Sequence, residues 1–218
     1  MSRPCTSASR DRVAPLSEMP AGRADRYRPH PLVRMADRLL RPSTGLVAAA
    51  LAYVFVADAL LSADLLGWPA NGVLDDPAHL ATAVIVVAAW RPRARVFVAT
   101  LLVVSIAIDV DHLPDVLGSR ILNPDTARPV THSLAILAAS ALIAGALTRS
   151  RLVGAAVAAG FAVHFFRDVA GEPGVPLLWP LSSSELHVPY AAYATTLCVI
   201  AAIAVIRSPR GSGVLETA

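Results

Sequence analysis

The sequence contains no lysine, few charged residues and only two cysteines. Charged residues make up 16% of its 218 residues, whereas hydrophobic residues make up 55%. This composition excludes a disordered chain and a fibrous repeat, and it disfavours an ordinary soluble domain. Cys5 lies in a polar segment, Cys198 lies in an apolar one, and there is no Cys-x-x-Cys pair. A disulfide scaffold and a cysteine-based metal motif are therefore excluded as well.

The positive charge is concentrated at the N-terminus. All 19 basic residues are arginines, and nine of them lie in residues 1–41, which show no apolar periodicity. We interpret residues 1–41 as a disordered, cytoplasmic tail that faces lipid head groups, and residues 209–218 as a short flexible tail. We do not expect nucleic-acid binding, because Tyr27 is the only aromatic residue of the N-terminal tail. The first apolar run begins only at Gly45, too late for a secretory signal peptide.

Six apolar stretches follow the tail, each rich in Ala, Val, Leu and Ile. They cover residues 45–66, 77–90, 95–112, 131–148, 151–170 and 187–206. Because they lack two-residue alternation, residues 42–208 are predicted to form an all-α, polytopic membrane bundle of about six transmembrane helices. A membrane span needs roughly 20 residues, and the apolar cores of the middle stretches have only about 12 to 15. Four or five spans, with the other helices buried in the bundle, are the alternative.

The arginines between these stretches predict an orientation. If the tail is cytoplasmic, 16 of the 19 arginines lie on the cytoplasmic side, and only Arg120, Arg128 and Arg167 lie on or near the other side. An excess of arginine in cytoplasmic segments is the known signature of orientation. The chain is therefore predicted to be a multi-pass protein of the inner (plasma) membrane with both termini in the cytoplasm.

Most of the histidines fall at the outward ends of the predicted helices. These are His79, His112, His132, His164 and His187, and the same end carries Asp109, Asp111, Asp115, Asp125, Asp168, Glu172 and Glu185. Ionisable groups at membrane depth are costly and are usually functional. Imidazoles that converge with carboxylates favour a first-row metal site. We predict one or two divalent ions, with zinc as the first choice and manganese as the alternative.

Two sequence spacings sharpen this prediction. Asp109 and His112 are three residues apart, and His164 and Asp168 are four apart, so each pair shares one face of a helix. Two ions bridged by an aspartate would activate a water molecule and neutralise a phosphate or carbonyl oxygen.

Other polar residues near this end have simpler interpretations. Thr131 is predicted to cap the helix that follows it. Asp58, inside the first stretch, is interpreted as a satisfied polar group, and His187 as an interfacial residue outside the ligand set. Arg128 and Arg167 are candidates for binding a phosphate, and an ion pair with a neighbouring aspartate is the alternative for Arg167.

These motifs resemble those of the bacterial inner-membrane, metal-dependent hydrolases of the YdjM type. The resemblance covers roughly residues 76–182, and it is carried by residues 108–112 (Ile-Asp-Val-Asp-His), 128–133 (Arg-Pro-Val-Thr-His-Ser), 164–168 (His-x-x-x-Asp) and 174–182 (Gly-Val-Pro-Leu-Leu-Trp-Pro-Leu-Ser). That family is in turn similar to zinc-dependent phospholipases C, mainly through the His-x-x-x-Asp element.

The resemblance implies a ligand set and an active-site loop at residues 174–180. The implied metal ligands are His79, Asp109, Asp111, His112, His132, His164 and Asp168. Which of Asp109 and Asp111 is a ligand and which is a general base stays open. The family usually has His-Arg-Gly before its Thr-His-Ser, but here Ala127 and Pro129 flank the arginine. This departure affects one ligand, or a second metal ion.

The predicted function is that of a metal-dependent hydrolase that cleaves a lipid-linked or head-group phosphoester at the outer face of the membrane. The predicted catalytic residues are Asp109, Asp111, Arg128 and Arg167. A metal-binding or metal-transporting membrane protein without hydrolysis is the alternative, as is a structural protein whose site has decayed. A lipid phosphate phosphatase with a histidine nucleophile is disfavoured, because the chain has no lysine and no Pro-Ser-Gly-His stretch.

Overall fold

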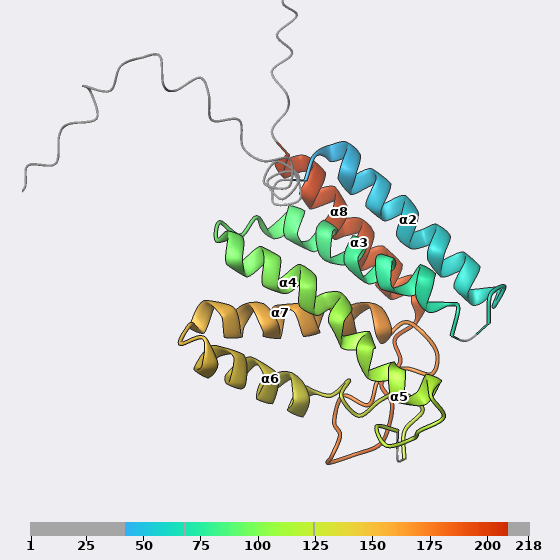
Figure 1. Ribbon diagram of the computed structural model, residues 1–218. Coiled ribbons are helices and arrows are strands. Elements are labelled where there is room, and N and C mark those ends of the chain that lie inside the picture. Colours follow the sequence, from blue (N-terminus) through green and yellow to red (C-terminus); the bar gives the residue numbers. More distant parts are fainter. Residues whose placement is uncertain (1–41, 68, 124, 209–218) are drawn as a thin grey trace, which may run out of the picture. The chain divides into compact units, whose positions relative to one another are not determined.

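The computed structural model describes residues 42–67, 69–123 and 125–208 (Figure 1). The predictions for the two tails, residues 1–41 and 209–218, lie outside this range. Within it, the regular structure is helical, and the only strand-like pairing is one antiparallel bridge between Val175 and Leu186. The predicted all-α class is confirmed.

Six helices correspond one to one to the six apolar stretches of the sequence. Within the described residues they are α2 (Thr44–Ser62), α3 (Gly72–Trp90), α4 (Arg95–Ala107), α6 (Leu134–Leu147), α7 (Arg151–Asp168) and α8 (Tyr190–Arg207). Helix α4 continues directly into a 3-10 helix, η3 (Ile108–His112), and a short turn of helix, α5 (Leu113–Val116). In Figure 1, α6 and α7 lie on one side of the bundle, and α2 and α8 lie on the other.

Not all six helices are equally suited to cross a membrane. In the described part of the chain, four are long and apolar enough, namely α2, α3, α8 and the continuous segment Arg95–Val116. Helix α6 is apolar but has only 14 residues. Helix α7 has 18 residues and carries arginine or aspartate at both ends. The bundle is therefore a polytopic membrane fold with four clear spans and two helices of intermediate character.

Helix α3 lies at the centre of the bundle. It contacts α2, α4, α7 and α8, and half of its apolar span is buried, against 22% of the spans of α2 and α8. Ile85 of α3 packs in one apolar cluster with Val54 of α2 and Leu197 of α8. Because α3 is surrounded, a polar side chain on its inner face is placed inside the protein.

Close packing through glycine holds α7 against its neighbours. A methyl group at Gly160 would lie 2.7 Å from the Cβ atom of Val104 in α4, and one at Gly154 would lie 2.7 Å from the carbonyl oxygen of Ala141 in α6. Such distances are too short for any side chain. Small residues of this kind allow membrane helices to approach closely, and here they let α7 pack against α4 at Gly160 and against α6 at Gly154.

The start of α6 differs from the prediction. The N-cap of α6 is Ser133, whose side chain accepts a hydrogen bond from the backbone N–H of Ile136. The predicted cap, Thr131, instead donates its hydroxyl hydrogen to Asp111 of η3. The prediction for Thr131 was wrong because Ser133 lies nearer the first turn, which leaves the threonine free to bond across to another helix.

Candidate metal centre

The predicted ligand residues come from four separate elements whose ends meet at one end of the bundle (Figure 1). His79 lies in the second turn of α3, and His132 directly precedes Ser133, the N-cap of α6. His164 and Asp168 lie in the last turns of α7, while Asp109, Asp111 and His112 lie in η3. The structure brings six of these seven residues together in two adjacent groups, and the seventh, Asp111, lies beside the second group.

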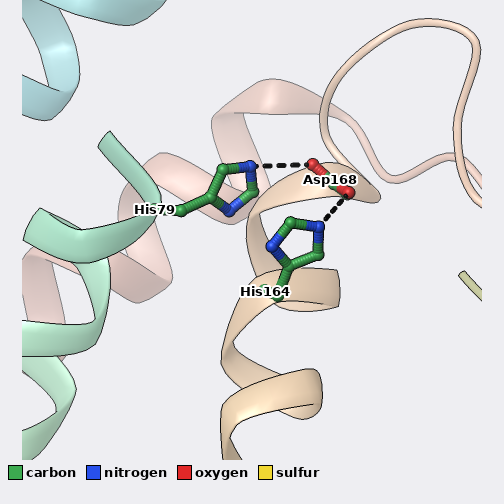
Figure 2. A group of neighbouring side chains, drawn as sticks. All are labelled: His79, His164 and Asp168. Atoms are coloured by element: carbon green, nitrogen blue, oxygen red, sulfur yellow. Dashed lines mark ion pairs between the residues drawn. The ribbon is translucent and has the colours of Figure 1, made fainter. Parts of the chain in front are cut away.

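The first group, here called the inner group, consists of His79, His164 and Asp168. The Nε2 atom of His79 lies 3.3 Å from Oδ1 of Asp168, and Nε2 of His164 lies 3.0 Å from Oδ2 of the same carboxylate. Figure 2 shows both rings turned toward this carboxylate from two different helices. The rings stack with centroids 4.0 Å apart. All three side chains are buried, and they offer ligand atoms within 4.8 Å of one another.

A backbone carbonyl orients one of these rings. Nδ1 of His164 lies 2.9 Å from the carbonyl oxygen of Ser105 in α4. A carbonyl can only accept a hydrogen, so Nδ1 carries the proton and the lone pair of the neutral ring lies on Nε2. Metal-binding histidines are usually held in this way by a partner on their other nitrogen.

The second group, here called the outer group, consists of Asp109, His112 and His132. Oδ1 of Asp109 lies 3.8 Å from Nε2 of His112 and 3.7 Å from Nε2 of His132. His132 is buried, but the side chains of Asp109 and His112 keep 13% and 20% of their surface exposed. The 3-10 winding of η3 brings residues three apart onto one side, which places Asp109 and His112 together.

The two groups touch one another. Nε2 of His132 lies 3.0 Å from Nε2 of His164 and 3.3 Å from Oδ2 of Asp168. Oδ1 of Asp109 lies 3.5 Å from Nε2 of His164. The arrangement therefore suits either one ion or a pair of ions that share a carboxylate.

Asp111 contacts the outer group through His132, on the side of the ring that faces away from the other ligands. Its Oδ2 atom lies 3.1 Å from Nδ1 of His132 and accepts the hydrogen bond from Thr131. Burial lowers the pKa of His132, but the close carboxylates of Asp109, Asp111 and Asp168 outweigh it and raise that pKa well above its ordinary value. A proton is thus held where a metal ion would bind, and metal binding would release it.

Unpartnered buried atoms show that these residues fit a metal ion. Neither ring nitrogen of His79 makes a hydrogen bond within the described part of the protein, and neither does Oδ2 of Asp109. A buried polar atom without a partner costs about 1–3 kcal/mol. The donors are imidazole nitrogens and carboxylate oxygens, a set that suits zinc and also manganese. An ion between Nε2 of His79 and Oδ2 of Asp109, which lie 3.8 Å apart, would satisfy these two atoms.

A cleft of about 1300 Å³ opens beside the centre. Its lining includes Asp109, His112, Arg128 and Asp168 as well as apolar side chains of α2 and α5. Small-molecule pockets usually measure roughly 300–1000 Å³. The cleft therefore has room for a ligand larger than a single head group.

The two candidate phosphate-binding arginines have different surroundings. The Nη1 atom of Arg128 lies 3.1 Å from Oδ2 of Asp168, so this guanidinium reaches the inner group from the cleft. Arg167 is buried, bonding Asp58 at 2.6 Å through Nη2 and Asp75 through Nη1. The ion-pair alternative for Arg167 is the arrangement found. Asp58 also accepts a hydrogen bond from Tyr190, which confirms that it is a satisfied polar group.

Sequence reasoning missed two contributors. Asp75 lies 3.8 Å from Nε2 of His79 and is bonded to Arg167. Its four-residue spacing to His79 repeats the spacing of His164 and Asp168, and that signal could have revealed it. The carbonyl of Ser105 leaves no signal in a sequence. Ala127, at the position of the family's missing histidine, lines the cleft.

A polytopic membrane bundle with a buried histidine and aspartate centre at one end is the class that this geometry defines. Residues 75–218, which are 144 of the 218 residues, match the YdjM inner membrane protein family, and the chain belongs to that family. The family named from the motifs is confirmed, and the chain is a membrane protein. Helix α2 precedes the matched residues. No curated protein and no solved structure matches the chain.

Proposed function

We propose that the protein is a membrane-embedded, metal-dependent hydrolase that cleaves a lipid-linked or head-group phosphoester at the outer face of the inner membrane. The observation that supports this most directly is the convergence of four histidines and two aspartates from four elements, with unpartnered atoms at its centre. Buried ionisable groups at this depth are costly and are seldom retained without a function.

The ligand roles follow from the contacts. His79, His164 and Asp168 would hold a first ion, and Asp109, His112 and His132 would hold a second. A divalent ion in such a site supplies a water molecule of pKa about 7 and polarises a phosphoryl oxygen. Zinc is the preferred ion and manganese is the alternative.

The remaining residues would position the reactants. Asp111 holds the ring of His132 through Nδ1 and does not line the cleft, so we assign it an orienting role. Asp109 faces both the histidines and the cleft. It is a ligand when two ions are bound and the candidate general base when only the inner group is filled. Arg128 would bind the phosphate, because it reaches the inner group from the cleft. Arg167 would act only indirectly, through Asp58 and Asp75.

Hydrolysis in this site would add water across a P–O bond. The hydroxyl of the water joins phosphorus, and its other proton goes to the leaving alcohol. A site at the end of a membrane bundle meets lipid head groups first, and Trp179 in the loop after α7 suits an anchor at the membrane surface. A lipid substrate follows from this position.

Metal analysis of the detergent-purified full chain is the first test. The wild type is expected to contain one or two transition-metal ions per chain, and His164→Ala and Asp168→Ala are expected to contain none. His187→Ala is the matched control, because His187 lies 3.4 Å from Glu172 and outside both groups. A wild type without any transition metal would remove the proposal. Assays over phosphodiesters and phospholipids then separate a hydrolase from a metal-binding or metal-transporting protein.

The membrane orientation has its own test. Cys5 and Cys198 are replaced, and a single cysteine is placed at Ser183, in the loop that follows α7. We expect a membrane-impermeant reagent to label it in intact cells. Labelling only after lysis would place the site on the cytoplasmic side.

A further inference from the structure

Asp75 reaches the metal centre from the first turn of α3, although it belongs to neither group of ligands. It lies four residues before His79, so both side chains lie on one face of α3. Its Oδ2 atom lies 3.8 Å from Nε2 of His79. Asp75 also lines the cleft, and 30% of its side-chain surface is exposed. The carboxylate therefore connects the cleft to the buried ring.

The Nε2 atom of His79 points to an ion at this position. The side chain of His79 is fully buried, and Nε2 makes no hydrogen bond to any residue that the structure describes. Three carboxylate oxygens surround this atom, namely Oδ1 of Asp168 at 3.3 Å, Oδ2 of Asp75 at 3.8 Å and Oδ2 of Asp109 at 3.8 Å. Bonds of about 2.0–2.2 Å place the ligands of one tetrahedral zinc ion about 3.3–3.6 Å apart. The two longer separations exceed that spacing by only a few tenths of an ångström.

Arg167 holds the opposite oxygen of the Asp75 carboxylate. Its Nη1 atom donates to Oδ1 of Asp75, and Oδ2 is the oxygen that faces His79. Its Nη2 atom donates to Asp58 of α2 at 2.6 Å, and Asp58 accepts a further hydrogen bond from Tyr190 of α8. Carboxylates that bind a metal ion are usually hydrogen-bonded in this way by a neighbouring side chain. Residues of three other helices thus fix the position of Asp75.

The charges around Arg167 also favour a cation beside Asp75. One guanidinium is paired with two carboxylates, so Arg167, Asp58 and Asp75 together keep one negative charge. A charge away from water is costly unless it is balanced. A divalent ion at His79 would balance this charge together with that of Asp168. The pairing with Arg167 therefore does not use up the charge of Asp75.

We propose that Asp75 is a further ligand of the ion at His79, and that Arg167 and Asp58 position its carboxylate. This inference rests on the metal-binding part of the proposed function and adds a residue on the cleft side of that ion. The competing role for Asp75 is to balance the charge of Arg167 and nothing more. The two roles differ in what Asp58, the other partner of the same arginine, contributes to metal binding.

Zinc titration of the metal-free, detergent-purified full chain against a chromogenic chelator separates these roles. Asp75→Asn is compared with Asp58→Asn, and with Asp76→Asn at the adjacent exposed aspartate. We expect Asp75→Asn to lower the zinc affinity of the tighter site by more than about 100-fold, beyond the loss that an orienting partner typically causes. Asp58→Asn should lower it by at most about tenfold. Asp76→Asn should lower it by at most about threefold, because an exposed charge acts weakly.

Equal losses in Asp75→Asn and Asp58→Asn would mean that Asp75 acts only through Arg167, and would overturn the inference. So would an unchanged affinity in Asp75→Asn. A wild type that binds no zinc would end the proposed function and this inference together, whereas a wild type that binds zinc without hydrolysis leaves the test intact.

Thermal unfolding controls for effects on folding. Without metal, Asp75→Asn and Asp58→Asn each leave Arg167 with one carboxylate, so both should unfold at similar temperatures. Saturating zinc should then raise the unfolding temperature less in Asp75→Asn, because a ligand stabilises the native state according to its affinity. An equal rise in the two variants would contradict a ligand role.

Asp75→Cys gives a direct readout of ligation. Cys5 and Cys198 are replaced by serine, and the purified chain is loaded with Co²⁺. Thiolates bind ions of this kind readily, and a thiolate bound to Co²⁺ absorbs intensely in the near ultraviolet. We expect this band in Asp75→Cys and not in Asp76→Cys, the matched control. No band in Asp75→Cys, or equal bands in both variants, would show that residue 75 does not reach the ion.

Discussion

The inner and outer groups use the same kinds of side chain in different settings. The inner group lies within regular helices, and its three side chains are almost fully buried. The outer group is built from a 3-10 turn and the residue before a helix cap, and two of its side chains are open to the cleft. Burial restricts exchange with solvent, whereas an open position admits water and substrate. The comparison suggests a firmly held inner ion and an exchangeable outer one.

The largest expected difference between the two groups is in metal content after one ligand of each group is removed. His164→Ala removes a ring that contacts both groups, through Asp168 at 3.0 Å and His132 at 3.0 Å. We expect total metal content to fall below one tenth of the wild-type value and hydrolysis to be lost. His112→Ala removes a partly exposed ligand of the outer group and should leave one tightly bound ion. Metal content measured by mass spectrometry checks both. Equal losses in the two variants would mean that the groups are not distinct.

The two groups should also differ in the rate at which a chelator removes their metal ions. With EDTA, we expect one ion to leave quickly and the other slowly, because Asp109 and His112 of the outer group are partly exposed whereas all three side chains of the inner group are buried. The loss of the second ion should lower the unfolding temperature more, since a ligand at about 100 times its Kd stabilises the native state by about 2.7 kcal/mol. Stopped-flow chelation with a chromogenic chelator, followed by thermal unfolding, measures both. A single rapid phase with full release would contradict the ranking.

Asp111→Asn should have a smaller effect, confined to the outer group. The amide keeps the size of the side chain but removes the charge that holds Nδ1 of His132 and accepts from Thr131. Loss of such an orienting partner typically costs about 10–100-fold in metal affinity or activity. Titration with zinc should show this decrease for the weaker site only. Asp115→Asn, on α5 and outside both groups, is the control for metal affinity.

Ala127→His should give the smallest change and in the opposite direction. Ala127 lines the cleft at the position where the family usually has histidine. A histidine there should slow the release of the outer ion by a few-fold, with little effect on the inner one. The chelation experiment reads this directly. Unchanged release would show that the position does not reach the outer ion.

The sequence was sufficient for the helices and for two of the ligand pairs, although the equally local pair Asp75–His79 was missed. Continuous apolar runs located all six helices, and the pairs Asp109–His112 and His164–Asp168 were placed on shared faces. Such pairs are set by the geometry of one helix and need no knowledge of its neighbours.

Contacts between different helices could not be predicted from the sequence. The bonds of Arg167 to Asp58 and Asp75 join residues 109 and 92 positions apart in the chain. Which helix stands beside which depends on packing at residues such as Gly160, and no spacing encodes that. The same limit applies to the roles of Asp109 and Asp111, because they differ only in which neighbour each one faces.

The carbonyl of Ser105 that holds His164 has a wider consequence. The acceptor belongs to the main chain, so replacement of the serine side chain leaves it in place. The tautomer of His164 therefore depends on how α4 packs against α7. A change in bilayer thickness that slides one helix along the other would thus be converted into a change in ligand strength, with no side chain altered.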